Sequence, residues 1–301
     1  MKVSVIYNPV SGKPGKKKAN LEAIHRGLAA FGKADFALFE TAFTGHATQL
    51  AKESALRGDN ICFAAGGDGT MHEVACGLLG SKTSLGIIPL GSGNGLARHL
   101  NIPLQPEEAI TTLLKGKNTP MDHGEVNQIP FFLAAGIGFE GVVARRFAQK
   151  KARGFFSYIT ASMQEYLKWK PIQYKTIYED EIMEGSAFTI DFANGSQYGN
   201  NAIISPGAAI DDGLLQFVRV LPFPLLEAPA MLKQLLEGRI NRSGYHLQRA
   251  FTRIELRIEG RNKIEGHTDG EPREFNLPLT VKVIPSSLLL RVPAEYGLNS
   301  E

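Results

Sequence analysis

The chain has 301 residues, enough to bury a sizeable core, and we expect two domains. A net charge of +3, with 43% hydrophobic and 21% charged residues, is typical of a soluble globular protein and excludes a strongly basic nucleic-acid binder. No apolar stretch approaches the ~20 residues of a membrane span, and the first residues carry no signal-peptide pattern. We therefore expect a cytoplasmic protein in which Cys62 and Cys76 are reduced core residues rather than a disulfide or a zinc site.

Strand-like and helix-like segments alternate over residues 1–120. Short runs predict strands at 3–7, 35–40, 60–65 and 85–90, and the apolar run at 60–65 predicts a buried one. Apolar residues at helical spacing predict helices between them, the first through Leu21, Ile24, Leu28 and Phe31, and the others at 44–57, 71–79, from 96, and at 106–115. This alternation predicts a Rossmann-like α/β domain, with a parallel sheet and helices on both faces.

The pattern changes after residues 115–120, which are expected to form a domain boundary. Further strand-like runs lie at 131–135, 173–178, 188–193, 214–220, 251–258 and 279–284, with helices expected at 158–167 and 225–237. Polar and apolar residues alternate in several of these runs, which predicts a mostly antiparallel β domain. We expect domains at 1–120 and 121–286, and about 287–296 as a strand returning to the first domain.

The central motif is Gly66-Gly67-Asp68-Gly69-Thr70, between a predicted strand and a predicted helix. Glycines at this position let backbone N–H groups face one point, and the helix adds the positive end of its dipole. These features predict a phosphate cradle. A carboxylate inside such a cradle repels phosphate, so we expect Asp68 to face Mg²⁺ or the attacking hydroxyl.

Two more glycine-rich loops follow predicted strands, Asn8-Pro9-Val10-Ser11-Gly12 and Gly91-Ser92-Gly93-Asn94. The second offers N–H groups and a hydroxyl to an oxyanion or a ribose. Ligands of open α/β sheets gather beyond the carboxyl ends of the strands, so all three loops should converge on one site.

Other motifs argue against competing enzyme classes. The chain has no P-loop, no protein-kinase signature and no His-Glu-x-x-His. The run Gly136–Gly141 fits the dinucleotide fingerprint, but no βαβ unit surrounds it, so a tight bend is the better interpretation. The adjacent His72 and Glu73 are more typical of a packed or capping pair than of a catalytic pair.

The three loops, extended from Pro89 to Arg98, together with Asp211-Asp212-Gly213, resemble the diacylglycerol kinase/sphingosine kinase catalytic superfamily in order and spacing over nearly the whole chain. The size resembles the compact bacterial lipid kinases. The resemblance implies an N-terminal nucleotide domain and a C-terminal β-sandwich-like lipid domain, with ATP between them. Where many bacterial members carry Asn and Asp, this chain has His72 and Gly95, and its third loop is closer to the sphingosine and ceramide kinase branch.

Site residues follow from the resemblance by motif position. It implies that ATP is lined by Asn8, Pro9, Val10, Ser11, Gly12, Thr44, Gly66, Gly67, Asp68, Gly69, Thr70, Met71 and His72, with Gly91, Ser92 and Asn94 beside the nucleotide. It implies that Glu271 is the general base, and Asp269 in the same turn is the alternative carboxylate. It implies a structural Mg²⁺ at Asp212 with the backbones of Ala209 and Leu214.

The resemblance implies an ATP- and Mg²⁺-dependent kinase that acts on a lipid hydroxyl. The alternatives are an NAD kinase, which also uses a Gly-Gly-Asp-Gly loop, and a non-catalytic nucleotide-sensing module. Basic residues near aromatic ones suit peripheral contact with an anionic membrane. They are Arg145, Arg146, Lys150, Lys151 and Arg153 before Phe155-Phe156, and Lys168-Trp169-Lys170. A solvated helix face explains these residues equally well.

Overall fold

The computed structural model describes residues 1–12, 15–30, 32, 35–149, 165–166, 168–178 and 181–297. The chain divides into two compact units. Unit 1 comprises residues 1–121 and 286–301, and unit 2 comprises residues 122–285. Two strands continue from one unit into the other: β5 (Lys117–Val126) and β16 (Leu279–Val292).

Unit 1 is built on a parallel sheet, as predicted. Its strands follow the order β2-β1-β3-β4, and the end of β16 adds a parallel partner to β4 through Leu290 and Leu85. The elements are β1 (Lys2–Tyr7), α1 (Lys17–Ala29), β2 (Asp35–Glu40), α2 (His46–Leu56), β3 (Ile61–Gly66), α3 (Asp68–Leu78), β4 (Ser84–Pro89), α4 (Gly95–His99) and α5 (Pro106–Lys115).

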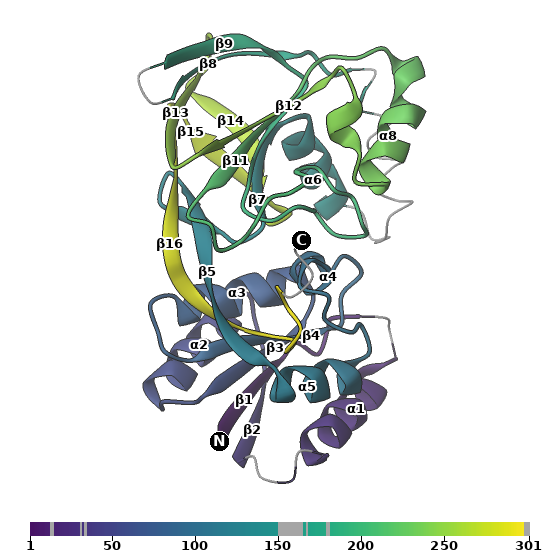
Figure 1. Ribbon diagram of the computed structural model, residues 1–301, viewed down its shortest axis with the longest axis vertical. Coiled ribbons are helices and arrows are strands. Elements are labelled where there is room, and N and C mark those ends of the chain that lie inside the picture. Colours follow the sequence, from purple (N-terminus) through teal and green to yellow (C-terminus); the bar gives the residue numbers. More distant parts are fainter. Residues whose placement is uncertain are drawn as a thin grey trace. The chain divides into compact units, whose positions relative to one another are not determined.

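The connections between strands run in opposite directions along the sheet on the two sides of the β1–β3 pair. From β1 the chain crosses to β2 on one side, and from β3 it crosses to β4 on the other side. Right-handed crossovers then place α1 and α3 on opposite faces of the sheet. In keeping with this, α1 packs with α5, and α2 packs with α3 (Figure 1). The carboxyl ends of β1 and β3 therefore flank the switch point, where sheets of this kind bind ligands.

Unit 2 is a mostly antiparallel β domain, again as predicted. One sheet has the order β12-β11-β10-β7-β14-β15, and a second layer contains β9, β8, β13 and β16. The remaining elements are β6 (Ile129–Phe131), β7 (Ala134–Gly138), α6 (Phe139–Gln149), β8 (Ile172–Tyr178), β9 (Glu181–Ala187), β10 (Thr189–Ala193), β11 (Leu215–Val220), η1 (Leu225–Glu227), α8 (Ala228–Leu236), η2 (Ile240–Arg242), β12 (His246–Phe251), β13 (Arg253–Ile258), β14 (Lys263–Thr268) and β15 (Glu271–Asn276).

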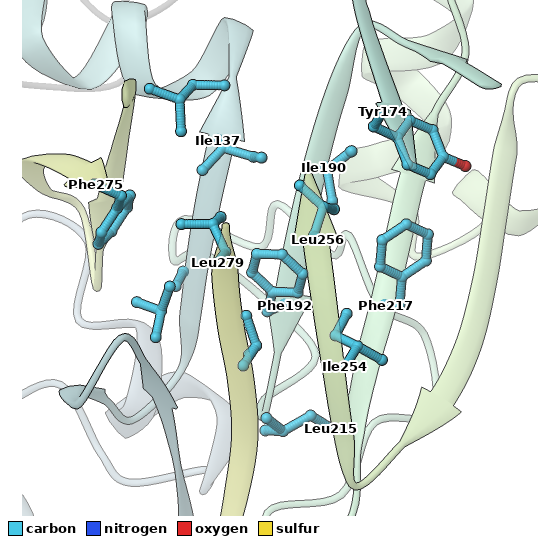
Figure 2. Packing of buried hydrophobic residues seen from close by; sticks show 14 of the residues in the cluster. Ile137, Tyr174, Ile190, Phe192, Leu215, Phe217, Ile254, Leu256, Phe275 and Leu279 are labelled. Carbon is cyan, nitrogen blue, oxygen red and sulfur yellow. The ribbon is translucent and has the colours of Figure 1, made fainter. Parts of the chain in front are cut away.

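Side chains from both layers of unit 2 form one hydrophobic core. Phe192 and Phe217 from the first sheet pack with Ile254, Leu256 and Leu279 from the second (Figure 2). Every second side chain of β13 is buried, whereas β7 and β10 are buried along their whole length. The alternation of polar and apolar residues in β13 therefore identified the side of the strand that faces the core.

Several expected boundaries are wrong. The strand β5 runs through residues 117–120, where the domain boundary was expected, and the two runs expected at 279–284 and 287–292 are one continuous strand. The run at 251–258 is divided, because β12 ends at Phe251 and β13 begins at Arg253. The helix expected at 225–237 begins as a 3₁₀ turn. Phe31 and most of the helix expected at 158–167 lie outside the described residues.

The expected core position is confirmed for Cys62 only. Cys62 is buried in β3, Cys76 is half-buried in α3, and neither forms a disulfide. Burial raises the pKa of the Cys62 thiol to about 12.

A buried carboxylate fixes the amino-terminal edge of the unit 1 sheet. Asp59 Oδ2 accepts hydrogen bonds from the hydroxyls of Ser4 and Ser54 and from Arg57 Nη2, the last two at 2.9 and 3.1 Å. Burial raises the pKa of Asp59, but these hydrogen bonds outweigh burial and hold the pKa below its usual value. The network ties β1 to the end of α2.

We expect Asp59→Ala to lower the free energy of unfolding by about 2–4 kcal/mol, because buried donors left without an acceptor cost about 1–3 kcal/mol each. Glu53→Ala is the matched control. Glu53 also pairs with Arg57, at 3.9 Å, but on the exposed side, so its loss should cost less than about 0.5 kcal/mol. Urea denaturation of both variants measures the difference, and equal losses would show that the buried network adds nothing.

Candidate functional site

Three glycine-rich loops meet at the carboxyl edge of the unit 1 sheet. They follow β1 (residues 8–12), β3 (residues 66–70) and β4 (residues 91–95), whose ends are neighbours in the sheet. The predicted convergence of the three loops is therefore confirmed. It also lies at the switch point between β1 and β3.

Asn8 joins the first loop to the second. Its Nδ2 donates to Thr70 Oγ1 at 2.9 Å, and its Oδ1 accepts from the Val10 N–H at 3.1 Å. Gly12 has a φ of +89°, and a Cβ there would lie 3.0 Å from the Leu90 carbonyl oxygen. Only glycine meets both requirements without strain.

Asp68 joins the second loop to the third. Its Oδ2 accepts from the Asn94 N–H at 2.9 Å and its Oδ1 from the Gly95 N–H at 2.7 Å, where α4 begins. Both carboxylate oxygens thus have a backbone donor, a role that the sequence did not suggest. The fit is close, because a Cβ at Gly93 would lie 2.7 Å from Asp68 Oδ2 and a Cβ at Gly91 would lie 2.6 Å from Gly67 Cα.

The third loop is shaped by its own asparagine. Asn94 is buried with a φ of +51°, and its side chain pairs with both the N–H and the carbonyl of Gly91, at 3.0 and 2.9 Å. Arg98 Nε donates to the Gly93 carbonyl at 3.0 Å. Ser92 remains exposed at the tip of the loop. Within the expected nucleotide set, Asn94 is therefore a shaping residue, and the Ser92 hydroxyl is accessible to a ligand.

The helix α3 buries the last two residues expected to line ATP. Met71 and His72 are 3% and 7% exposed, whereas the backbone of residues 67–69 is partly accessible. Glu73 caps α2, because its carboxylate accepts the N–H groups of Gly45 and Ala47 at 2.9 and 3.1 Å. The capping interpretation of Glu73 is confirmed. Thr44, just before this cap, is exposed.

In unit 2, Asp269 and Gly270 form the turn between β14 and β15, both with positive φ. The Asp269 carboxylate accepts three backbone N–H groups, from Phe132, Leu133 and Ala134, with shortest distances of 2.9, 2.8 and 3.2 Å. It therefore locks the turn to the segment before β7. Glu271, the first residue of β15, is exposed, and none of the described residues bonds to its carboxylate.

Three aspartates lie in or beside the loop at 209–214. Asp212 Oδ1 accepts the Leu214 N–H at 2.9 Å, and the buried Asp122 Oδ2 accepts the Gly213 N–H at 2.7 Å. Burial, together with the charges of Asp122 and Asp212, raises the pKa of Asp211. Clustered carboxylates beside backbone carbonyls fit a hard cation such as Mg²⁺. Sequence reasoning missed Asp122, whose only signal was a charged residue within a buried strand.

The basic residues give little support to a membrane surface. Arg145 pairs with Glu265, and Arg146 pairs with Glu165. Trp169 donates its indole N–H to the Phe188 carbonyl at 3.0 Å and packs with Phe139, as a core residue does. Tyr166 also packs in this cluster. Lys150, Lys151, Arg153, Phe155, Phe156, Met163 and Leu167 lie outside the described residues.

The Gly136–Gly141 run is a junction between β7 and α6 rather than a simple bend. Gly138 has a φ of +93°, and the helix begins at the next residue. Because β7 is antiparallel to both of its neighbours, no parallel βαβ unit is present here. The dinucleotide interpretation is excluded. The helix itself was not expected.

Comparison with known proteins agrees with this geometry. Residues 2–126 match the model of the diacylglycerol kinase catalytic domain, and residues 134–292 match the YegS C-terminal NAD kinase beta sandwich-like domain. A "probable lipid kinase YegS-like" from Pseudomonas aeruginosa is 32% identical over 294 residues, which cover 95% of this chain and 94% of that protein. The chain belongs to the YegS-like lipid kinase family.

Other relatives extend the match. A YegS-like lipid kinase from Yersinia pestis is 31% identical over 84% of this chain and 86% of its own. The crystal structure of a diacylglycerol kinase from Bacillus anthracis has the same fold, with a TM-score of 0.76 at 24% identity over 97% of this chain and 96% of its own. A second structure from that organism gives a TM-score of 0.80 at 26% identity, with the same coverage.

This YegS-like kinase is thus a transferase of the lipid-kinase type. Among the described residues, no helix has the length and apolar character needed to cross a bilayer.

We expect stability to separate the two carboxylates of the β14–β15 turn. Asp269→Ala leaves three backbone donors without an acceptor and should lower the free energy of unfolding by about 2–4 kcal/mol. Glu271→Gln changes an exposed side chain and should stay within about 0.5 kcal/mol of wild type. Thermal and urea unfolding of both variants test this, and a strongly destabilised Glu271→Gln protein would contradict the exposed placement of Glu271.

Proposed function

We propose that this chain transfers the γ-phosphoryl group of ATP to the hydroxyl of a lipid. The observation that supports this most directly is the junction of three glycine-rich loops at the switch point of a parallel sheet. Phosphoryl transfer depends on positioning and charge neutralisation more than on covalent chemistry, and loops of this kind supply the positioning.

The N–H groups of residues 66–69 and the start of α3 would hold the ATP phosphates. Asn8 to Gly12 would border the nucleotide on one side, and Ser92 on the other. Asp68 would act first by holding the third loop beside the second. Its remaining lone pairs would face a water ligand of the Mg²⁺ that accompanies ATP.

The proton of the acceptor would go to Glu271. As the acceptor oxygen bonds to the γ-phosphorus, the bond from that phosphorus to the bridging oxygen breaks, and ADP leaves with the electron pair. The Glu271 carboxylate takes the hydroxyl proton and later releases it to water. Bound Mg²⁺ would neutralise the phosphate charge, and a second ion would be held structurally by Asp212 with the carbonyls of Ala209 and Leu214.

The acceptor would be a lipid that carries a free hydroxyl. Diacylglycerol, monoacylglycerol, sphingoid bases, ceramide and phosphatidylglycerol all present a hydroxyl beside acyl chains. The C-terminal match is described as NAD kinase beta sandwich-like, so NAD is the rival acceptor. Mass spectrometry of the products formed from ATP with a total lipid extract, and separately with NAD, distinguishes the two. No product from either would favour a nucleotide-sensing module.

Nucleotide binding should depend on the open backbone of the central loop. A Cβ at position 67 meets only Gly91 Cα, at 3.4 Å, so Gly67→Val should fold while its side chain obstructs the phosphates. We expect ATP affinity to fall at least about tenfold, which is ~1.4 kcal/mol. Calorimetry measures the affinity, with Gly67→Ala as the smaller control. An unchanged dissociation constant in a folded Gly67→Val protein would rule out this placement.

Catalysis should depend on the basicity of Glu271. Glu271→Gln preserves size and removes the base, so kcat should fall by ~10²–10⁴ while ATP affinity persists. The matched control is Glu274→Gln on the same strand, where an exposed carboxylate pairs with Lys263 at 2.7 Å. Retained activity in Glu271→Gln, with loss of activity in a folded Asp269→Asn protein, would instead assign the base to Asp269.

A further inference from the structure

Three residues stand in one row across three strands of unit 2. Asp191 on β10 and His267 on β14 both lie opposite Gly136 on the central strand β7. Residues opposite one another on neighbouring antiparallel strands project from the same face. A Cβ at Gly136 would lie 2.4 Å from Asp191 Oδ1 and 2.6 Å from His267 Nε2. The two side chains thus lean over the glycine and occupy the space that a side chain there would need.

Glu140, on α6, covers this row. Its Oε2 lies 3.2 Å from His267 Nε2, and its Oε1 accepts the Tyr198 hydroxyl at 2.8 Å. One ligand atom from each of Glu140, Asp191 and His267 lies within 4.8 Å of the other two. The helix packs on both β7 and β14, so it holds Glu140 over the row.

Asp191 lacks a compensating partner. It is 0% exposed, and within the described part of the chain no donor meets hydrogen-bond geometry at either carboxylate oxygen; the nearby Tyr198 hydroxyl lowers the pKa of Asp191 but donates to Glu140. Burying an unpaired carboxylate costs several kcal/mol, and a second carboxylate nearby adds repulsion. Burial, and next the charge of Glu140, raise the pKa of Asp191 well above its ordinary value. The group therefore needs a proton or a cation among its oxygens.

We propose that Glu140, Asp191 and His267 bind one divalent transition-metal ion, with Zn²⁺ as the first candidate. One imidazole and two carboxylates in a closed, buried setting are typical ligands of such ions, whereas Mg²⁺ prefers oxygen ligands alone. Two ligand atoms ~2.0–2.1 Å from a tetrahedral Zn²⁺ lie about 3.3 Å apart, close to the separation of Glu140 Oε2 and His267 Nε2. Tyr198 would orient Glu140 from outside the ligand shell.

Metal binding would change the tautomer of His267 and remove one of its hydrogen bonds. The Gly270 N–H donates to His267 Nδ1 at 3.3 Å, so in the metal-free protein the imidazole proton is on Nε2 and is directed at Glu140. A metal at Nε2 displaces this proton to Nδ1, and the long hydrogen bond from Gly270 is lost. The ¹⁵N shifts of His267 therefore report occupancy directly.

The ion would have a structural role. It would cross-link α6, β10 and β14, and β14 leads directly into the turn that carries Asp269 and Glu271. This site is separate from the acidic loop at 209–214 and does not depend on the kinase proposal.

The test uses the full chain, stripped with a chelator and titrated with Zn²⁺ or Co²⁺ by calorimetry, visible absorption of Co²⁺ and ¹⁵N spectroscopy. We expect one ion per chain, a Co²⁺ spectrum of low coordination number, and a shift of the His267 tautomer. Tyr198→Phe should weaken binding ~10–100-fold, and Asp191→Asn and His267→Gln should weaken it by at least about 100-fold.

Two variants serve as controls. Glu265→Gln removes an ion pair between β14 and Arg145 of α6, and Asp212→Asn removes a carboxylate of the other acidic loop. Both should bind Zn²⁺ as wild type does. A wild-type chain without a one-to-one site would overturn the proposal and indicate a proton shared by Asp191 and Glu140. Wild-type affinity in Asp191→Asn would also overturn it. If that variant does not fold, Tyr198→Phe and the wild-type titration decide.

Discussion

Hydrogen bonds from backbone N–H groups to an aspartate carboxylate fix the conformation of both candidate sites. Asp68 accepts two such groups across 26 and 27 residues of sequence, and Asp269 accepts three across 135 to 137 residues. Hydrogen bonds to an ionised acceptor are roughly twice as strong as neutral ones, which offsets the cost of partly burying the charge. Each aspartate precedes a glycine, so each can lie in a tight connection while its side chain reaches a distant segment.

This device explains why Asp68 and Asp269 resemble catalytic residues in sequence and yet act first on architecture. The pairing of β3 with β4 and the Leu90 N–H bonded to the Gly66 carbonyl at 2.8 Å fix the bases of the second and third loops, and Asp68 adds a link from the second loop to the start of α4. Glycines then determine how closely the loops approach, because Gly67 and Gly91 nearly touch backbone to backbone. The N–H groups that would face phosphate are thus presented by loops that cannot shift independently.

The predictable part of the structure is the part that local sequence determines. Buried parallel strands such as β3 are uninterrupted apolar runs, and glycine-rich loops follow their ends, so unit 1 and the convergence of its loops could be predicted. β14 and β15 could not, because Lys263–Thr268 and Glu271–Asn276 contain few apolar residues and are ordered by pairing with each other and with β7. β5 was not expected as a strand, because its exposed first residues are polar and lie where the sequence predicts a domain boundary.

Site residues follow the same division. The motif positions from Asn8 to Asn94 could be selected from sequence, but the structure separates loop-shaping residues such as Asn94 from accessible ones such as Ser92. Asp122 and the group Glu140, Asp191 and His267 could not be selected, because only strand register brings their side chains together. Gly136 was visible as part of a run that fits the dinucleotide fingerprint, and the sequence favoured a tight bend there. The register shows that the groups approaching that glycine are the protein's own side chains, Asp191 and His267. A glycine in the middle of a strand therefore indicates that some group lies close to the backbone, without specifying which group. At Gly136 the residues on the two neighbouring strands show that these groups are the charged side chains of an internal cluster rather than a ligand.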